Sequence, residues 1–240
     1  MSRNVLGVIG GLGPLATARF LELVARMTDA EREQDNVSMI VYNFPSIPDR
    51  TGYILGSNLR SPLPGLLSVG RELDRQQVRC IAIPCVTAHF FYEELTEGLR
   101  SPILHGIRDT VAHLKENGVS STGIMATDGT IISGLFSQEL LKAGIRPVLP
   151  TKPRQADVMH LIYNNIKAGE APEMERFAAV EEELRSRGAE TIILGCTELS
   201  LIKRDFPLNP GFLDSMEVLA KKAIEECGKP LRKKYQCLIT

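Results

Sequence analysis

The chain of 240 residues has no tryptophan, almost no net charge and no long run of apolar residues. Its 28 lysine and arginine residues are balanced by 29 aspartate and glutamate residues, so the net charge is −1. This balance argues against a basic surface for nucleic acid. No apolar stretch reaches the roughly 18 residues that a membrane-spanning helix needs. We therefore expect a small-molecule partner, with neither nucleic acid nor membrane involved.

The cysteines lack the spacing of a metal site or of a paired redox motif. They number five, an odd count, and stand at Cys80, Cys85, Cys196, Cys227 and Cys237. No C-x-x-C pair occurs among them, which argues against a structural metal site. The apolar run at residues 5–9 is too short for a secretory signal. We therefore expect a cytoplasmic protein that holds no metal and keeps its thiols reduced.

Short β-branched runs alternate with longer amphipathic segments along the chain. The runs predict strands at residues 5–9, 38–44, 80–84, 121–126, 147–149 and 191–194, with a short extended segment at 103–107. The amphipathic spacing predicts helices at residues 17–30, 61–77, 88–99, 109–117, 157–167, 173–187 and 215–227, and another that ends at 141. This alternation predicts an α/β fold with parallel sheets covered by helices on both faces.

The two halves of the chain resemble each other. Gly-Val-Ile-Gly-Gly-Leu-Gly at residues 7–13 resembles Gly-Ile-Met-Ala-Thr-Asp-Gly at residues 123–129. Each half also has a strand that leads into a cysteine with a threonine close behind, at Cys85 and Cys196. A duplicated unit explains both likenesses, although every α/β protein repeats strand, turn and helix. We predict two pseudo-symmetric open parallel-sheet domains, residues 1–112 with 213–240 and residues 113–212, with the active site in the cleft between them.

Cys85 and Cys196 are the strongest candidates for chemistry. Each follows a predicted strand and precedes a predicted helix, and open parallel sheets bind ligands at the carboxyl ends of their strands. A nearby helix N-terminus favours a thiolate. A free cysteine often only fills space in a core, which is our interpretation of Cys80 and Cys227. Two thiols facing each other across a cleft suit racemisation, in which one removes an α-proton and the other delivers one.

Five motifs resemble those of the aspartate/glutamate racemase family, and together they cover essentially the whole chain. They are Gly-Gly-Leu-Gly-Pro14, Ser46-Ile-Pro-Asp-Arg-Thr51, Pro84-Cys-Val-Thr-Ala-His89, Leu161-Ile-Tyr-Asn-Asn-Ile-Lys167-Ala-Gly169 and Leu194-Gly-Cys-Thr-Glu198. The resemblance implies interconversion of L- and D-aspartate or glutamate without pyridoxal phosphate, metal or any other cofactor. It implies Cys85 and Cys196 as the two catalytic bases. It also implies a substrate pocket that contains Asp49, Arg50, Thr87, Thr127, Lys167 and Thr197.

The residue types in these motifs fit such a substrate. Arg50 presents a rigid fork that can hold a carboxylate through two hydrogen bonds, and Lys167 is a point charge suited to a second carboxylate. Gly11 belongs to a tight turn whose amides can approach an anion. The threonine hydroxyls can donate to substrate, or they can cap helices. Glu198 and His89 flank the cysteines and could tune thiol protonation, although a structural role is favoured for His89.

One residue departs from the family pattern. Val86 stands where asparagine is common in the family, and valine cannot hydrogen-bond substrate. We place Val86 at the substrate, so either another donor replaces the amide or the substrate is not plain aspartate or glutamate. Related isomerases or racemases that act on hydantoins or dicarboxylates remain alternatives. Single-thiol decarboxylases are a further alternative, but they need only one cysteine and this chain offers two.

Two other classes of protein are also considered. Gly11-Leu-Gly13-Pro-Leu-Ala16 fits a dinucleotide-binding pattern, but the second strand ends without the acidic residue that would hold a ribose. A two-lobed protein that binds an amino acid without catalysis would need no thiol on each face of the cleft. An enzyme is therefore the favoured class, and we expect it to form a homodimer.

Overall fold

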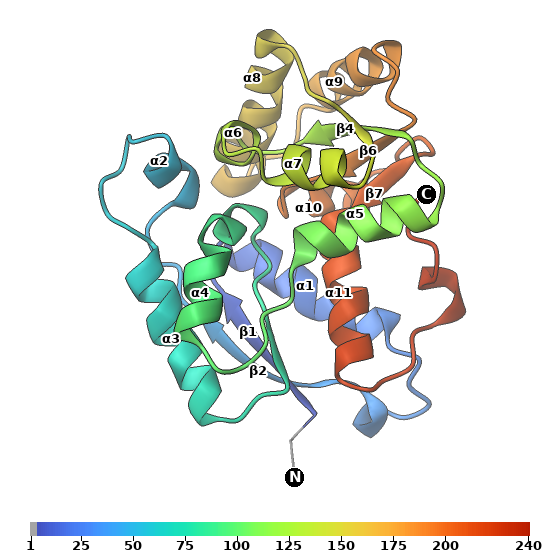
Figure 1. The fold of residues 1–240 in the computed structure, drawn as a ribbon. Coiled ribbons are helices and arrows are strands. Elements are labelled where there is room, and N and C mark those ends of the chain that lie inside the picture. Colours follow the sequence, from blue (N-terminus) through green and yellow to red (C-terminus); the bar gives the residue numbers. More distant parts are fainter. Residues whose placement is uncertain (1–3) are drawn as a thin grey trace.

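The structure, a computed structural model that describes residues 4–240, contains two parallel sheets, each flanked by helices (Figure 1). The first sheet has the strand order β2-β1-β3. Its strands are β1 (Val5–Gly10), β2 (Ser38–Asn43) and β3 (Cys80–Ala82). Its helices are α1 (Pro14–Met27), α2 (Arg50–Ile54), α3 (Leu63–Arg75), α4 (Tyr92–Gly98) and α5 (Gly106–Glu116), with 3-10 helices at Glu33–Asp35 and Val86–Phe91.

The second sheet has the strand order β5-β4-β6-β7 and lies in the upper half of Figure 1. Its strands are β4 (Ser121–Met125), β5 (Arg146–Val148), β6 (Thr191–Leu194) and β7 (Phe212–Asp214). Its helices are α6 (Asp128–Ile132), α7 (Leu135–Lys142), α8 (Lys152–His160), α9 (Met174–Ser186) and α10 (Leu199–Asp205). A π-helical turn at Leu161–Asn165 and a 3-10 helix at Ile166–Ala168 follow α8.

The last long helix, α11 (Ser215–Glu226), joins the two halves. It leaves β7 of the second sheet and packs against α1 and α5 beside the first sheet (Figure 1). One hydrophobic cluster therefore contains Leu6 of β1, Ile193 of β6 and Ile224 of α11. A short 3-10 helix at Lys233–Tyr235 precedes the C-terminus. The boundaries of the two domains remain a prediction. The first three residues of the first predicted domain lie outside the described residues.

Three predicted helices are broken where the sequence pattern suggested continuous ones. The segment at 88–99 begins as the 3-10 helix Val86–Phe91 and becomes α4 only at Tyr92. The helix ending near 141 is divided into α6 and α7 by Gly134, whose φ of 67° an α-helix cannot contain. The segment at 157–167 leaves α-geometry after His160, where the π-helical turn begins. The three-residue strand β7 was not predicted.

Among residues 4–240, no helix is both long and apolar enough to cross a membrane.

Candidate active site

Both candidate cysteines line one small chamber between the two sheets. Cys85 follows β3 of the first sheet, and Cys196 follows β6 of the second, so each lies beyond the carboxyl end of a parallel strand. The chamber is lined by Leu12, Asp49, Arg50, Thr51, Cys85, Val86, Thr87, Thr127, Lys167, Cys196, Thr197 and Glu198. Its free volume is about 10 Å³, close to the room that one water molecule needs. A molecule the size of an amino acid therefore does not fit within this chamber alone.

The structure brings every predicted site residue except Gly11 to this chamber. Gly11 lines an adjoining outer cavity instead. Its φ is 90°, and a Cβ there would lie 2.4 Å from the backbone nitrogen of Phe44, so only glycine fits this turn. The Gly11 amide already donates a hydrogen bond to Thr17 Oγ1 at 2.9 Å, which leaves it occupied rather than free for an anion.

Cys196 lies against a buried carboxylate. Its side chain is 6% exposed, and its thiol donates to Glu198 Oε2 at 2.9 Å. Burial and the negative charge of Glu198 raise the pKa of Cys196 well above its ordinary value, against the opposing effect of Lys167. Cys196 therefore holds its proton firmly while Glu198 is ionised.

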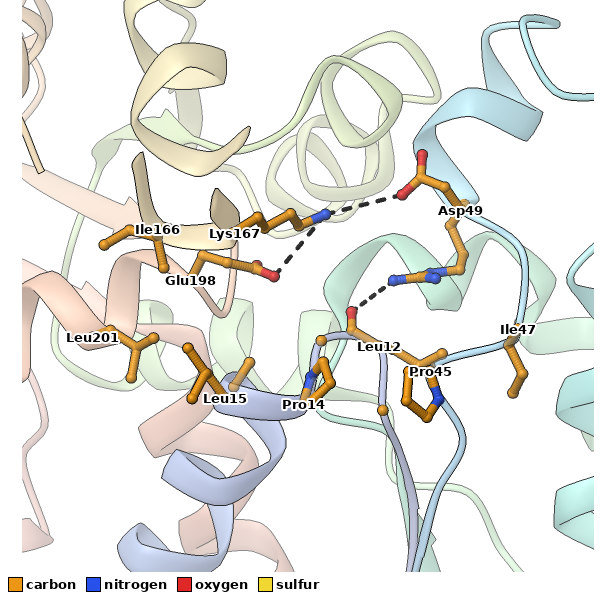
Figure 2. Close-up of a pocket in the computed structure, with 14 residues that line it drawn as sticks. Leu12, Pro14, Leu15, Pro45, Ile47, Asp49, Ile166, Lys167, Glu198 and Leu201 are labelled. Carbon is orange, nitrogen blue, oxygen red and sulfur yellow. Dashed lines mark hydrogen bonds and ion pairs between the residues drawn. The ribbon is translucent and has the colours of Figure 1, made fainter. Parts of the chain in front are cut away.

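Cys85 lies against a cation instead. The Arg50 guanidinium donates to the carbonyl of Leu12 at 2.6 Å, which is drawn as a dashed line in Figure 2. It also donates to the carbonyl of Pro48 at 3.1 Å. Burial works to lower the pKa of Arg50, but the negative charge available at Cys85, followed by Asp49 and Glu198, raises it overall. Arg50 therefore places a buried positive charge beside Cys85. The two thiols thus have opposite electrostatic surroundings.

Lys167 links carboxylates from both halves of the chain. Its Nζ lies 3.9 Å from Asp49 Oδ1 and 4.0 Å from Glu198 Oε1 (Figure 2). The same Nζ lies 4.0 Å from the centre of the Tyr163 ring. Burial opposes the charge of Lys167, but Glu198, Cys196, Tyr163 and Asp49 together raise its pKa. The π-helical turn that precedes Lys167 is a geometry often found at functional sites.

Threonine hydroxyls form a second link across the chamber. Thr127 Oγ1 lies 3.1 Å from the hydroxyls of both Thr51 and Thr87. Thr87 also lies 3.1 Å from the hydroxyl of Thr130. Thr127 in addition caps α6, as the alternative interpretation of these residues expected. Thr51 and Thr130 were not predicted as site residues, although Thr51 ends the motif that contains Arg50.

His89 supports the turn that carries Cys85. It is buried, and its Nε2 accepts a hydrogen bond from the Gly106 amide at 3.1 Å. Nδ1 therefore carries the proton and faces the carbonyls of Cys85 and Val86 at 3.2 and 3.1 Å. Burial lowers the pKa of His89, so the ring is neutral. These contacts agree with a structural histidine rather than one that touches substrate.

The outer cavity has a volume of about 320 Å³ and shares five residues with the chamber. The shared residues are Leu12, Asp49, Arg50, Lys167 and Glu198. Its remaining wall is mostly apolar, as Figure 2 shows for Pro14, Leu15, Pro45, Ile47, Ile166 and Leu201. Leu15 is 61% exposed, so this cavity meets the surface of the protein. The outer cavity therefore forms the approach to the chamber.

Two buried thiols at strand ends, surrounded by charged and hydroxyl side chains, define a cleft for acid–base chemistry on a small polar molecule. Residues 9–223 match the family described as Asp/Glu/Hydantoin racemase, and the chain belongs to this family. The chain is thus an isomerase, an amino-acid racemase of the aspartate/glutamate type. The predicted family and enzyme class are confirmed.

Individual relatives agree with this assignment. The structure of Picrophilus torridus aspartate racemase is 31% identical, covers 98% of both chains and has a TM-score of 0.84. The broad specificity amino-acid racemase RacX of Bacillus subtilis is 25% identical over 92% of this chain and 96% of its own length. Glutamate racemase from Francisella tularensis, solved with D-glutamate, shares the fold at 18% identity, with a TM-score of 0.67 over 94% of this chain and 81% of that one. The predicted two-domain α/β fold is confirmed.

Proposed function

We propose that the enzyme interconverts L- and D-aspartate or glutamate through a two-base mechanism that uses Cys85 and Cys196. The observation that carries the proposal is that both thiols line one chamber, although they come from different sheets. A single chamber with thiols on walls from both halves offers an α-carbon a base on one face and an acid on the other.

In one direction, the Cys85 thiolate removes the α-proton and becomes a thiol. The electron pair left on the α-carbon is delocalised into the substrate carboxylate, which the surrounding donors stabilise. The Cys196 thiol then delivers its proton to the opposite face and becomes a thiolate. The reverse direction starts from this second protonation state. The surroundings of the two thiols support Cys85 as the base and Cys196 as the acid of the forward direction. Cys85 lies beside the positive charge of Arg50, and Cys196 lies beside the carboxylate of Glu198.

An acidic substrate is supported by two cations at the chamber and by the name of the Picrophilus relative. We propose Arg50 as the anchor for the distal carboxylate and Lys167 for the second carboxylate. Arg50 Nε is buried without a hydrogen-bond partner among the described residues. Thr87, Thr127 and Thr197 are proposed to donate hydroxyl hydrogen bonds.

A neutral amino acid is the second candidate substrate. The charges of Arg50 and Lys167 are balanced by those of Asp49 and Glu198, so the site has no surplus positive charge that demands an acidic side chain. Val86 is apolar, and so is most of the outer cavity. The name of the Bacillus relative describes broad specificity, which agrees with this alternative.

Proton NMR in D2O with a panel of L- and D-amino acids tests the proposed function. We expect loss of the α-proton signal and formation of the opposite enantiomer for aspartate or glutamate. Exchange with neutral amino acids alone would favour the second candidate. An enzyme that exchanges no α-proton in the whole panel would refute the proposed racemisation of these amino acids.

Val86→Asn tests which substrate the chamber fits. If the substrate is acidic, the added amide should raise kcat/KM for aspartate or glutamate about tenfold, the worth of one net hydrogen bond. If the native substrate places an apolar group against Val86, the amide is left unmatched and kcat/KM falls. Measuring both proteins over acidic and neutral amino acids separates the two cases. No change with any substrate would show that residue 86 does not contact it.

Activity is expected to survive dialysis against EDTA, and the active protein should show no pyridoxal absorbance. The two thiols supply both proton transfers in the proposed mechanism, so neither a metal nor pyridoxal phosphate is needed. Restored activity after adding metal or pyridoxal phosphate to inactive protein would contradict this prediction.

We also propose that the enzyme is a cytoplasmic homodimer.

A further inference from the structure

Glu198 has one carboxylate oxygen toward a thiol and the other toward the outer cavity. Oε2 accepts the Cys196 thiol at 2.9 Å and the Thr197 hydroxyl at 3.3 Å. Oε1 lies 4.0 Å from Lys167 Nζ and 3.4 Å from the position that a Cβ on Gly13 would take, and Gly13 lines the outer cavity. Figure 2 shows Glu198 in the wall of the outer cavity, and the same residue also lines the chamber. It is only 5% exposed.

We propose that Glu198 carries protons between Cys196 and the outer cavity and thereby resets the enzyme between turnovers. The inference rests on the proposed two-base mechanism. It adds a group that this mechanism needs but does not itself contain.

The need follows from the protonation states that each turnover leaves. A turnover that begins with a Cys85 thiolate and a Cys196 thiol ends with a Cys85 thiol and a Cys196 thiolate. Before a second turnover in the same direction, Cys196 must gain a proton and Cys85 must lose one. The chamber has room for about one water molecule, so bulk solvent has little direct access to Cys196. A proton-carrying group that reaches both the chamber and the outer cavity can exchange protons between Cys196 and solvent.

Glu198 performs the transfer with water as the only other reactant. The protonated carboxyl donates its proton from Oε2 to the Cys196 thiolate, which forms the S–H bond and leaves a carboxylate. Oε1 then takes a proton from water in the outer cavity, and the hydroxide that remains is neutralised by the proton that Cys85 releases in the same reset. A half-turn about the last side-chain torsion brings the new carboxyl proton to the thiol side. This torsion is broad and roughly two-fold in glutamate, so the half-turn is accessible. The reverse sequence removes a proton from the Cys196 thiol.

The surroundings single out Glu198 for this role. Among the described residues, it is the carboxylate that a chamber thiol contacts. Asp49, the other carboxylate of the chamber, is engaged by the Gly52 amide at 2.6 Å and the Tyr163 hydroxyl at 3.3 Å. Lys167 between them keeps its proton, because the surrounding negative charges raise its pKa. It therefore acts as a fixed charge and not as a carrier.

Glu198→Gln tests the inference, since glutamine keeps the size and one acceptor oxygen for the Cys196 thiol but cannot carry a proton. We expect kcat to fall about 100-fold, the lower end of the range for a general acid–base group, with KM nearly unchanged. Glu198→Asp should recover part of the loss. Glu217→Gln is the matched control, because Glu217 is also buried and pairs with a lysine, Lys203, at 2.8 Å but does not line the chamber. This control should retain near-normal kcat.

Chemical rescue separates proton transfer from a structural role. Glu198→Ala opens space beside the outer cavity, and added formate should restore kcat at least tenfold over the unrescued variant. Nitrate has a similar planar shape and charge but does not take up protons near neutral pH, so it should not restore activity. Rescue by both anions, or normal kcat in Glu198→Gln, would overturn the carrier role while leaving the two-base mechanism intact. If the wild-type enzyme racemises no amino acid, both the carrier role and the two-base mechanism are wrong.

Discussion

Replacing either Cys85 or Cys196 with serine is expected to abolish racemisation. A serine hydroxyl is too weak an acid to exist as its anion near neutral pH, so the variant has lost a base in one direction and an efficient acid in the other. One general acid–base group is worth about 10²- to 10⁴-fold, and each variant should lose at least that much in kcat/KM. Racemisation measured in both directions by chiral separation checks the prediction.

Each single variant should keep part of the chemistry. With Cys196→Ser, the Cys85 thiolate can still exchange the α-proton of the enantiomer whose C–H bond faces it. With Cys85→Ser, the other enantiomer should exchange. Exchange in D2O followed by NMR would therefore show opposite preferences in the two variants.

Cys237→Ser is the control for the loss of a thiol, because Cys237 is exposed and outside the chamber. Near-normal turnover in either Cys85→Ser or Cys196→Ser would contradict the two-base assignment. The same preference for one enantiomer in both variants would show that the thiols do not serve opposite faces.

The placement of the two cysteines could be predicted because it depends on local sequence. The runs at residues 80–84 and 191–194 are apolar and β-branched, and each leads directly into its cysteine. Parallel strands expose their carboxyl ends at one edge, so two such strands in two similar halves bring two thiols toward one cleft. Lys167 could be placed only through its motif, since the π-helical turn before it leaves no periodic signal.

The contacts of the charged site residues could not be predicted, because they arise from tertiary packing. Glu198 flanks Cys196 in sequence, but nothing in the sequence shows that its two oxygens face different spaces. Arg50 was expected to be free for substrate, whereas two of its nitrogens hold the carbonyls of Leu12 and Pro48. Such bonds depend on how the loops after β1 and β2 meet, which a local pattern does not record.

Arg50→Ala is expected to lower kcat/KM for aspartate or glutamate about 100-fold or more. A distal carboxylate would lose a buried charge-assisted bond, which typically costs a few kcal/mol. The variant also leaves the carbonyls of Leu12 and Pro48 without their donor and removes the cation beside Cys85. Those two losses affect every substrate, so neutral amino acids should also slow, but by a smaller factor.

Arg50→Lys separates these contributions. Lysine keeps a positive charge near Cys85 but lacks the planar fork, so it cannot reproduce both carbonyl bonds and a carboxylate contact together. We expect neutral substrates to recover more fully than acidic ones in this variant. The measurement is kcat/KM for an acidic and a neutral amino acid in all three proteins. Equal losses for both substrates in Arg50→Ala would rule out Arg50 as the anchor of a distal carboxylate. Arg50 would then act only through its hydrogen bonds to the carbonyls of Leu12 and Pro48 and its charge beside Cys85.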